Sequence, residues 1–213
     1  QLHWEPTASP SCWHGITSVI TGNCGFTLAP ARPEDVPWLL QMLSRVEGMS
    51  PETLAAGVRF AGGGIGEFRR GLEGRLGVNV GLQVGHSALR RYVLGKEASE
   101  RASRPDEIAQ MCELLRAGLR EGAIGFSSSQ LDLHVDHEGR PVPGSTFLHQ
   151  DRADHFRLMA ESKPLAEGKH ADGWMSVSTG RGSITTFLRD AYQKFPKELE
   201  LDFAPEPGRR RSG

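Results

Sequence analysis

Three polar clusters in this sequence could do chemistry, and each follows a short, apolar, β-prone run. Cys24 lies between glycines just after the run 15–21. His86 and a serine follow the run 78–84, and the serines 127–129 end the run 123–127. Together they offer a thiol, an imidazole and hydroxyls, which are groups that ligate metals, attack carbonyl carbons or hydrogen-bond a substrate.

The chemistry of Cys24 has three interpretations. As a thiolate it would be a strong zinc ligand, and the flanking Gly22 and Gly25 would let a metal approach the backbone closely. As a nucleophile it would need a histidine within hydrogen-bond reach, and His86 is the candidate. As a small buried hydrophobe at a strand end it would do no chemistry. The spacing alone leaves all three open.

The elements that would position these clusters alternate between strand and helix. We predict strands at 15–21, 78–84 and 123–127, and a helix over 33–46. A second helix is predicted from 105 to about 121, with Ser103 as its cap and Cys112 on its packed apolar face. Strand and helix in alternation indicate an α/β fold with parallel strands.

In a parallel sheet the carboxyl ends of the strands meet at one edge, and the loops there are free to bind ligands. We therefore expect Cys24, His86 and Ser127 to lie at one rim. In this arrangement His86 and Ser127 would face the substrate, whereas His86 could equally tie the following loop to the backbone.

Composition excludes several classes of protein. A formal net charge of −1 and a pI near 6.8 give no field that favours nucleic acid or an anionic membrane surface. The three cysteines form no CxxC pair, which favours a reducing, cytoplasmic location. The sequence has no apolar stretch of membrane-spanning length. Because it opens on Gln1 rather than methionine, we expect a processed or truncated piece.

The residues around Cys24 carry a family resemblance. Residues 11–30, which include Gly-Asn-Cys-Gly, resemble the N-acyl-D-amino-acid deacylase (D-aminoacylase) branch of the amidohydrolase superfamily. Segments 45–49, 84–90 and 121–127 match the same branch in the same order, and the loop 137–143 is similar to one of its loops. The resemblance covers about residues 1–143.

The resemblance implies a (β/α)8 TIM barrel of the metal-dependent hydrolase type, with zinc at the carboxyl ends of its strands. It implies hydrolysis of the amide bond of a small-molecule N-acyl-D-amino acid, with Cys24 as a zinc ligand. A carboxylate late in the barrel would serve as general base. Neither a nucleic-acid partner nor a membrane partner is expected, and the oligomeric state is left open.

Several residues that such a site needs are not assigned. The family's His-x-His pair would precede this segment, and His3 does not match it. The histidines and aspartates after 145 lack a preceding predicted strand and are interpreted as surface residues: His149, His155, His170, Asp151, Asp154 and Asp172. The catalytic residues therefore stay unknown.

The expected organisation is a partial barrel over 1–145, about strands 2 to 4 with their helices, followed by a divergent segment over 146–213. That segment would hold one helix near 183–195 and a disordered tail. A whole barrel needs about 250 residues. We therefore expect this chain to bind zinc weakly and to lack turnover. The alternative is a non-catalytic remnant of a barrel, retained for packing or partner binding.

Overall fold

A computed structural model describes residues 1–130, 134–144 and 174–179, the last of these as backbone only. The predicted helix near 183–195, the predicted disordered tail, and the histidines and aspartates between 149 and 172 lie outside these residues.

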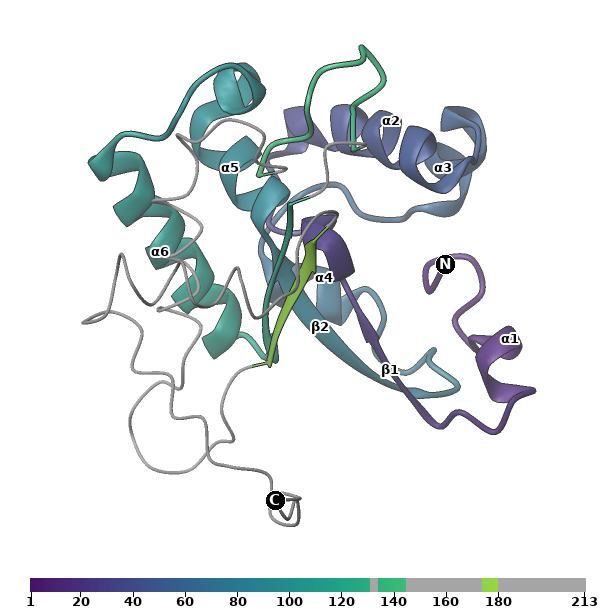
Figure 1. Cartoon of the computed structure of the whole chain (residues 1–213). Helices are drawn as coiled ribbons and strands as arrows, with labels where there is room; N and C mark the ends of the chain where they lie inside the picture. The colour runs from purple at the N-terminus through teal and green to yellow at the C-terminus, as the bar shows by residue number, and fades with distance from the viewer. Residues whose placement is uncertain (131–133, 145–173, 180–213) are drawn as a thin grey trace, which may run out of the picture.

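Four parallel strands form one sheet, in the order in which they occur along the chain (Figure 1). They are β1 (Ser18–Thr21), β2 (Asn79–Gly85), β3 (Gly125–Gln130) and β4 (Trp174–Thr179). The three strands predicted from the sequence are confirmed, although β1 begins at Ser18 rather than at 15. The pairing of β4 with β3 was not predicted. The α/β class is therefore confirmed for the described residues, which form a small sheet with covering helices.

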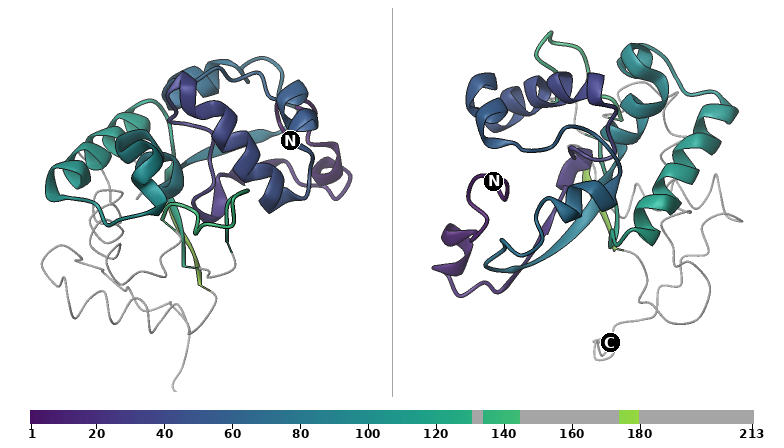
Figure 2. Two further views of the ribbon diagram at one scale, coloured as in Figure 1. Left: turned by 90° about the horizontal axis from the view of Figure 1, so that it is seen from above. Right: turned by 180° about the vertical axis from the view of Figure 1, so that it is seen from behind.

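Helices supply the crossovers that parallel strands require. A short helix, α1 (Ser9–Cys12), precedes the sheet. Between β1 and β2 lie the 3-10 turns η1 (Asn23–Gly25) and η2 (Pro33–Asp35) and the helices α2 (Val36–Glu47), α3 (Pro51–Gly57) and α4 (Ile65–Arg70). Between β2 and β3 lie α5 (His86–Leu94), the 3-10 turn η3 (Gly95–Ser99) and α6 (Pro105–Arg120). Figure 2 shows these two groups of helices from above and from behind.

The predicted helix over 33–46 corresponds to η2 followed by α2. Its buried side chains, Val36, Leu39, Leu40 and Met42, recur at helical spacing. The helix ends at Gly48, which adopts a φ of 66°. That left-handed conformation suits glycine and is a common helix stop.

The second predicted helix, α6, packs closely on the sheet. Cys112 is buried there, as predicted, beside Met111 and Leu115. A Cβ at Gly118 would lie 2.9 Å from Cγ2 of Val84, so only glycine lets the helix approach β2 this closely.

The expected cap of α6 is wrong. Arg104, not Ser103, is the N-cap residue, and its backbone N–H donates to the Glu107 carboxylate at 2.8 Å. The Ser103 hydroxyl instead accepts from the guanidinium of Arg90 at 2.7 Å. The preference of serine for caps was overridden because a buried arginine needs acceptors.

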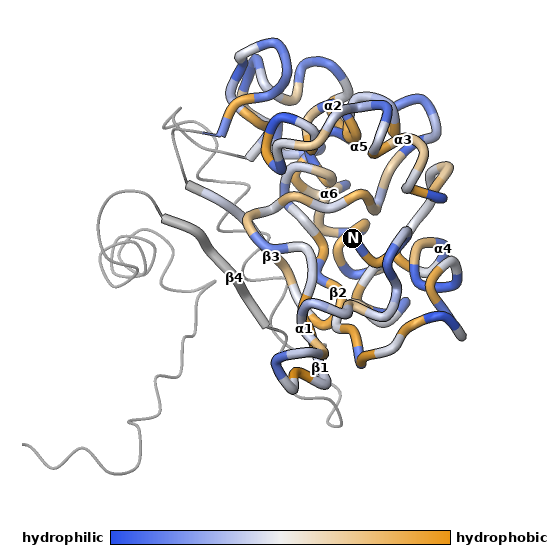
Figure 3. Tube along the Cα trace, turned by 90° about the vertical axis from the view of Figure 1, so that its right-hand side faces the viewer, coloured by the Kyte–Doolittle hydropathy of each residue, from blue (hydrophilic) through white to orange (hydrophobic). Residues whose placement is uncertain are grey.

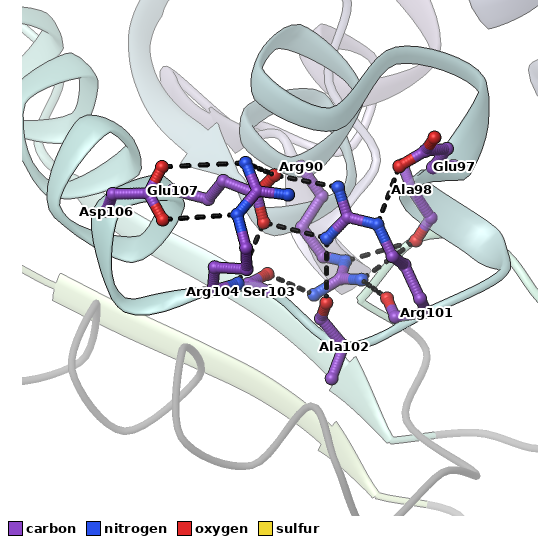
Figure 4. Close-up of polar contacts among 9 residues, drawn as sticks. All are labelled: Arg90, Glu97, Ala98, Arg101, Ala102, Ser103, Arg104, Asp106 and Glu107. Carbon is purple, nitrogen blue, oxygen red and sulfur yellow. Dashed lines mark hydrogen bonds and ion pairs between the residues drawn. The ribbon is translucent and has the colours of Figure 1, made fainter.

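Arg90 organises the loop between α5 and α6 (Figure 4). Its side chain is completely buried. It donates to the carbonyl oxygens of Ala98 and Arg101 at 2.9 and 2.8 Å. Next to it, Glu107 accepts from both terminal nitrogens of Arg101, at 2.8 and 2.7 Å. The crossover to β3 is therefore held by charge-assisted hydrogen bonds that are buried or partly buried.

The hydrophobic core lies between the sheet and the helices. Hydrophilic residues dominate the loops at the top of the molecule in Figure 3. The core includes Leu39, Met42, Val84, Leu89, Met111, Leu115 and Phe126, each completely buried. Within the described ranges, no helix has the length and apolar character needed to cross a bilayer.

Candidate functional site

The turn after β1 carries Cys24 in a conformation that side chains rarely adopt. Gly22, Cys24 and Gly25 have φ values of 91°, 59° and 78°. Of the three, only Cys24 has a Cβ, and a left-handed backbone costs an L-residue about 1–2 kcal/mol. The two glycines allow the chain to reverse sharply here, so that Cys24 lies in the turn just after the strand. Its side chain is half-buried.

A hydroxyl on β3 holds this turn. The backbone N–H of Gly25 donates to Oγ of Ser127 at 3.1 Å, although the two residues are 102 positions apart. The same hydroxyl donates to the carbonyl oxygen of Gly22. Ser127 is completely buried. The sheet thus fixes both ends of the turn through one side chain.

The end of β2 lies against the same turn. A Cβ at Gly25 would lie 3.3 Å from Cα of Ser128 and 3.6 Å from the backbone nitrogen of His86. A Cβ at Gly85 would lie only 2.4 Å from the carbonyl oxygen of Gly25. The ends of β1, β2 and β3 therefore converge on η1, as parallel pairing predicts (Figure 1).

His86, predicted to face substrate, is the first residue of α5 and is completely buried. Its ring nitrogen Nδ1 lies 2.9 Å from Oγ of Ser128. Gly144 packs so closely that a Cβ there would lie 2.7 Å from the same ring nitrogen. The structure thus brings Cys24, Ser127 and His86 to one rim. A substrate contact for His86 or Ser127 stays a prediction.

A second histidine at this rim was missed by the sequence analysis. Nδ1 of His134 lies 3.0 Å from Oγ of Ser129, and its ring packs edge-on against Phe26 with centroids 4.8 Å apart. Burial lowers the pKa of His134 below its ordinary value. The available signal was its position shortly after the third strand, where rim loops begin.

Zinc is the metal that the resemblance implies, and the donors at the rim fit it only in part. A half-buried thiol just beyond a strand end is a suitable donor for zinc. However, no group of three or more His, Cys, Asp or Glu that could hold a metal occurs in the part of the chain that the structure describes. Cys24 therefore fits one ligand position, and the described residues do not complete the set.

A cavity of about 680 Å³ lies beside the turn but does not contain the predicted site residues. It is lined by the N-terminal segment, β1, β2 and the helices α2 to α4, and it includes Gly22 and Thr27 but not Cys24. His3 lies in its wall, where Nδ1 accepts from the backbone N–H of Arg59 at 3.4 Å. Its ring packs edge-on against Phe68, with centroids 5.0 Å apart. Here His3 has a packing role.

Comparison with curated proteins identifies several relatives of this chain. No family model matches the sequence. An uncharacterized protein of Mycobacterium tuberculosis is 33% identical over 186 residues, which cover 84% of this chain and 28% of that protein. The N-acyl-D-aspartate deacylase of Alcaligenes xylosoxydans xylosoxydans is 37% identical over 125 residues, covering 58% of this chain and 22% of the enzyme. The D-aminoacylase of the same organism is 34% identical over 121 residues, covering 56% and 22%.

Solved structures of a D-aminoacylase and of a related deacylase also match this chain. A D-aminoacylase crystal structure described as defining a novel subset of amidohydrolases matches with a TM-score of 0.52 and 25% identity, over 75% of this chain and 29% of that one. The N-acyl-D-glutamate deacylase of Bordetella bronchiseptica, complexed with zinc and a phosphonate inhibitor, matches with a TM-score of 0.52 over 76% and 29%. At 22% identity this second match speaks for the fold alone.

The described residues thus form part of an α/β fold, in which Cys24, His86 and Ser127 lie at the carboxyl ends of parallel strands. The named homologues and structural neighbours of this chain are D-aminoacylases and N-acyl-D-amino-acid deacylases of the amidohydrolase superfamily, and the likeness covers part of the chain. The chain spans 28% of the length of the uncharacterized mycobacterial relatives and 43% of that of the N-acyl-D-glutamate deacylase of Alcaligenes xylosoxydans xylosoxydans.

Proposed function

We propose that this chain is part of a zinc-dependent amidohydrolase that hydrolyses the amide bond of N-acyl-D-amino acids. The observation that carries the proposal is the placement of Cys24 in a left-handed turn where three parallel strands end. The resemblance to D-aminoacylases in the same segment supports it. The fold would be a piece of a (β/α)8 barrel, which is consistent with four parallel strands in chain order.

In this proposal Cys24 supplies one thiolate ligand to the metal. Zinc, when bound, polarises an amide carbonyl and lowers the pKa of a coordinated water to about 7. This chain's own contribution is positional: Gly22 and Gly25 shape the turn, and β3 anchors it. The general base and the remaining ligands stay unassigned.

This chain is expected to bind zinc weakly and to show no deacylase turnover. The reason is the incomplete donor set among the described residues. The test measures the zinc content of the chain after gel filtration. It also measures hydrolysis of an N-acetyl-D-amino acid, monitored by the release of the free amino acid. About one zinc per chain together with turnover would show that the chain completes the site itself, and would overturn this expectation.

The same incompleteness favours a second candidate, a non-catalytic remnant of the barrel. The two differ in what Cys24 does. A remnant would not bind a metal at the rim. Neither Cys24→Ser nor added zinc would then change its unfolding temperature. If the chain is part of a zinc hydrolase, added zinc raises the unfolding temperature of the native chain but not that of the Cys24→Ser variant.

A further inference from the structure

β1 forms one edge of the sheet, and among the described strands only β2 pairs with it (Figure 1). The carbonyl oxygen of Thr17 accepts from the backbone N–H of Asn79 at 2.9 Å, so the backbone of Thr17 faces β2. In a strand this direction alternates from one residue to the next, and Val19 therefore faces β2 as well. The N–H and C=O groups of Ser18 and Ile20 point the other way, out of the sheet.

These outward groups are accessible. Ser18 and Ile20 are the two exposed residues of β1. Within the ranges that the structure describes, no backbone hydrogen bond outside the sheet ladder involves either residue. A row of unpaired N–H and C=O groups is the pattern that a second extended chain satisfies. The free edge of β1 therefore has the chemistry of a strand-binding site.

The sequence of this edge lacks the features that block pairing. Residues 15–22 contain no charged residue and no proline. Ile16 and Ile20 are exposed to 43% and 41%, which is unusual for large apolar side chains. Many edge strands carry lysine, proline or a bulge that prevents association. An uncharged, apolar edge does not repel a second copy of itself.

The edge is also complementary to itself in hydrogen bonding. In an antiparallel pair, residues that face each other with their backbone groups exchange two N–H···O bonds. Two copies can pair with Ser18 of each opposite Ile20 of the other, which satisfies the outward groups of both residues in both copies. Val19 then lies opposite Val19 of the second copy, in a non-hydrogen-bonded pair, as its direction toward β2 requires. A two-fold axis perpendicular to the sheet relates the copies.

We propose that this chain forms a weak homodimer in which the β1 edges of two copies pair antiparallel and join the two sheets into one. The dimer is weak because β1 has only four residues, and small interfaces are typical of transient contacts. The inference goes beyond the proposed function and needs no metal at the rim. A closed barrel has no free edge, so a dimer through β1 would favour the remnant retained for partner binding over the hydrolase.

The test measures the mass of the full chain by sedimentation velocity from about 5 to 500 µM. Ser18→Pro removes an outward N–H at the first residue of the strand, where proline leaves the bonds to β2 in place. Ile20→Lys puts a charge in the middle of the edge. Trp4→Lys is the control, because Trp4 is exposed to the same 41% as Ile20 but lies outside β1. Circular dichroism checks that each variant is folded.

We expect the native chain and Trp4→Lys to change from monomer to dimer with a dissociation constant of about 100 µM. Ser18→Pro and Ile20→Lys should weaken the dimer at least tenfold. A native chain that is still monomeric at the highest concentration would overturn the proposal. A dimer that survives in both edge variants would also overturn it, because the contact would then lie on another surface. Loss of the dimer in Trp4→Lys would indicate non-specific apolar association and would have the same consequence.

Hydrogen exchange tests the pairing in the native chain without any variant. The amides of Ser18 and Ile20 should exchange about tenfold more slowly in the concentrated chain than in the dilute chain, whereas the amide of Val19 should not change. Exchange that is fast at both concentrations would contradict pairing at this edge. Exchange that is slow at both would show that another segment of the chain covers the edge, which also overturns the proposal. The zinc measurement described above tests the hydrolase proposal separately.

Discussion

Nδ1 of the His86 ring lies 2.9 Å from Oγ of Ser128, so the first residue of α5 is bonded to the neighbouring strand β3. The ring is completely buried and packs against Gly144 of the loop that follows β3. This contact joins a helix start, a strand end and a loop at the rim where Cys24 lies. The contact of the His86 ring is to a hydroxyl on β3 and not to a backbone carbonyl, and a substrate contact for His86 stays a prediction.

Gly144 tests how tightly the loop is fitted to His86. Its φ is 81°, and a Cβ would lie 2.7 Å from Nδ1 of His86. Gly139 has a similar φ of 78° with nothing within 4 Å of its Cβ position. Both alanine substitutions incur backbone strain, but only Gly144→Ala adds a steric clash. We expect it to lower the free energy of unfolding by about 1–3 kcal/mol more than Gly139→Ala does, measured by urea denaturation. Equal losses would show that the loop yields freely.

Arg90 is expected to stabilise the crossover between α5 and α6. Replacing it by methionine keeps much of the aliphatic stem but leaves the carbonyls of Ala98 and Arg101 without this donor. We expect Arg90→Met to lower the free energy of unfolding by about 3 kcal/mol. Arg69→Met is the matched control, because the Arg69–Glu73 ion pair is more than half exposed. It should cost less than about 1 kcal/mol. Similar losses in the two variants would contradict the role given to Arg90.

Glu107 links stability to acid pH. Its hydrogen bonds with Arg101 are the main cause that lowers its pKa from 4.5 to about 2. A carboxyl with a depressed pKa contributes stability above pH 4.5, and loses it as the pH falls toward 2. Glu107→Gln should therefore be less stable at pH 7 and lose less stability between pH 4.5 and pH 2. Chemical denaturation across that range measures the difference. A variant that kept the native pH profile would exclude this linkage.

Protonation of His134 is expected to lower stability at mildly acid pH, just as protonation of Glu107 lowers it at more acid pH. Burial lowers its pKa below 6.5, so protonation favours the unfolded chain. The contribution is complete above pH 6.5 and is lost as the pH falls below that value through the pKa of the folded protein. His134→Gln should lessen the fall in stability between pH 7.5 and 5.5, since a neutral amide does not titrate. The experiment is thermal unfolding at the two pH values, and a fall as large as that of the native chain would count against the assignment.

Three of the four strands, β1 to β3, were predicted because each is short, β-prone and bounded by glycine. The helices α2 and α6 were predicted because their apolar residues recur at helical spacing. The strand β4 was missed because Trp174–Thr179 follows a charged stretch with no helical pattern of its own. The pairing with β3 that defines β4 depends on contacts distant in sequence, which local patterns do not encode.

The candidate site was predicted in location but not in detail. Parallel topology was enough to place Cys24, His86 and Ser127 at one rim. It could not specify that the Ser127 hydroxyl bonds the turn, because that depends on which face of β3 meets η1. Nor could it identify His134, whose significance lies in its contacts with Ser129 and Phe26 and not in a motif.

The most direct test of the central claim places this rim in a complete enzyme. The segment of N-acyl-D-aspartate deacylase that matches this chain, 125 residues long, is replaced by the corresponding residues of this chain. Zinc content and hydrolysis of the N-acyl-D-amino acid are then measured for that chimera and for its Cys24→Ala variant, with folding checked by circular dichroism. We predict that the chimera retains zinc and turnover, and that Cys24→Ala loses both. A folded Cys24→Ala chimera with zinc and activity equal to those of its parent would contradict the account.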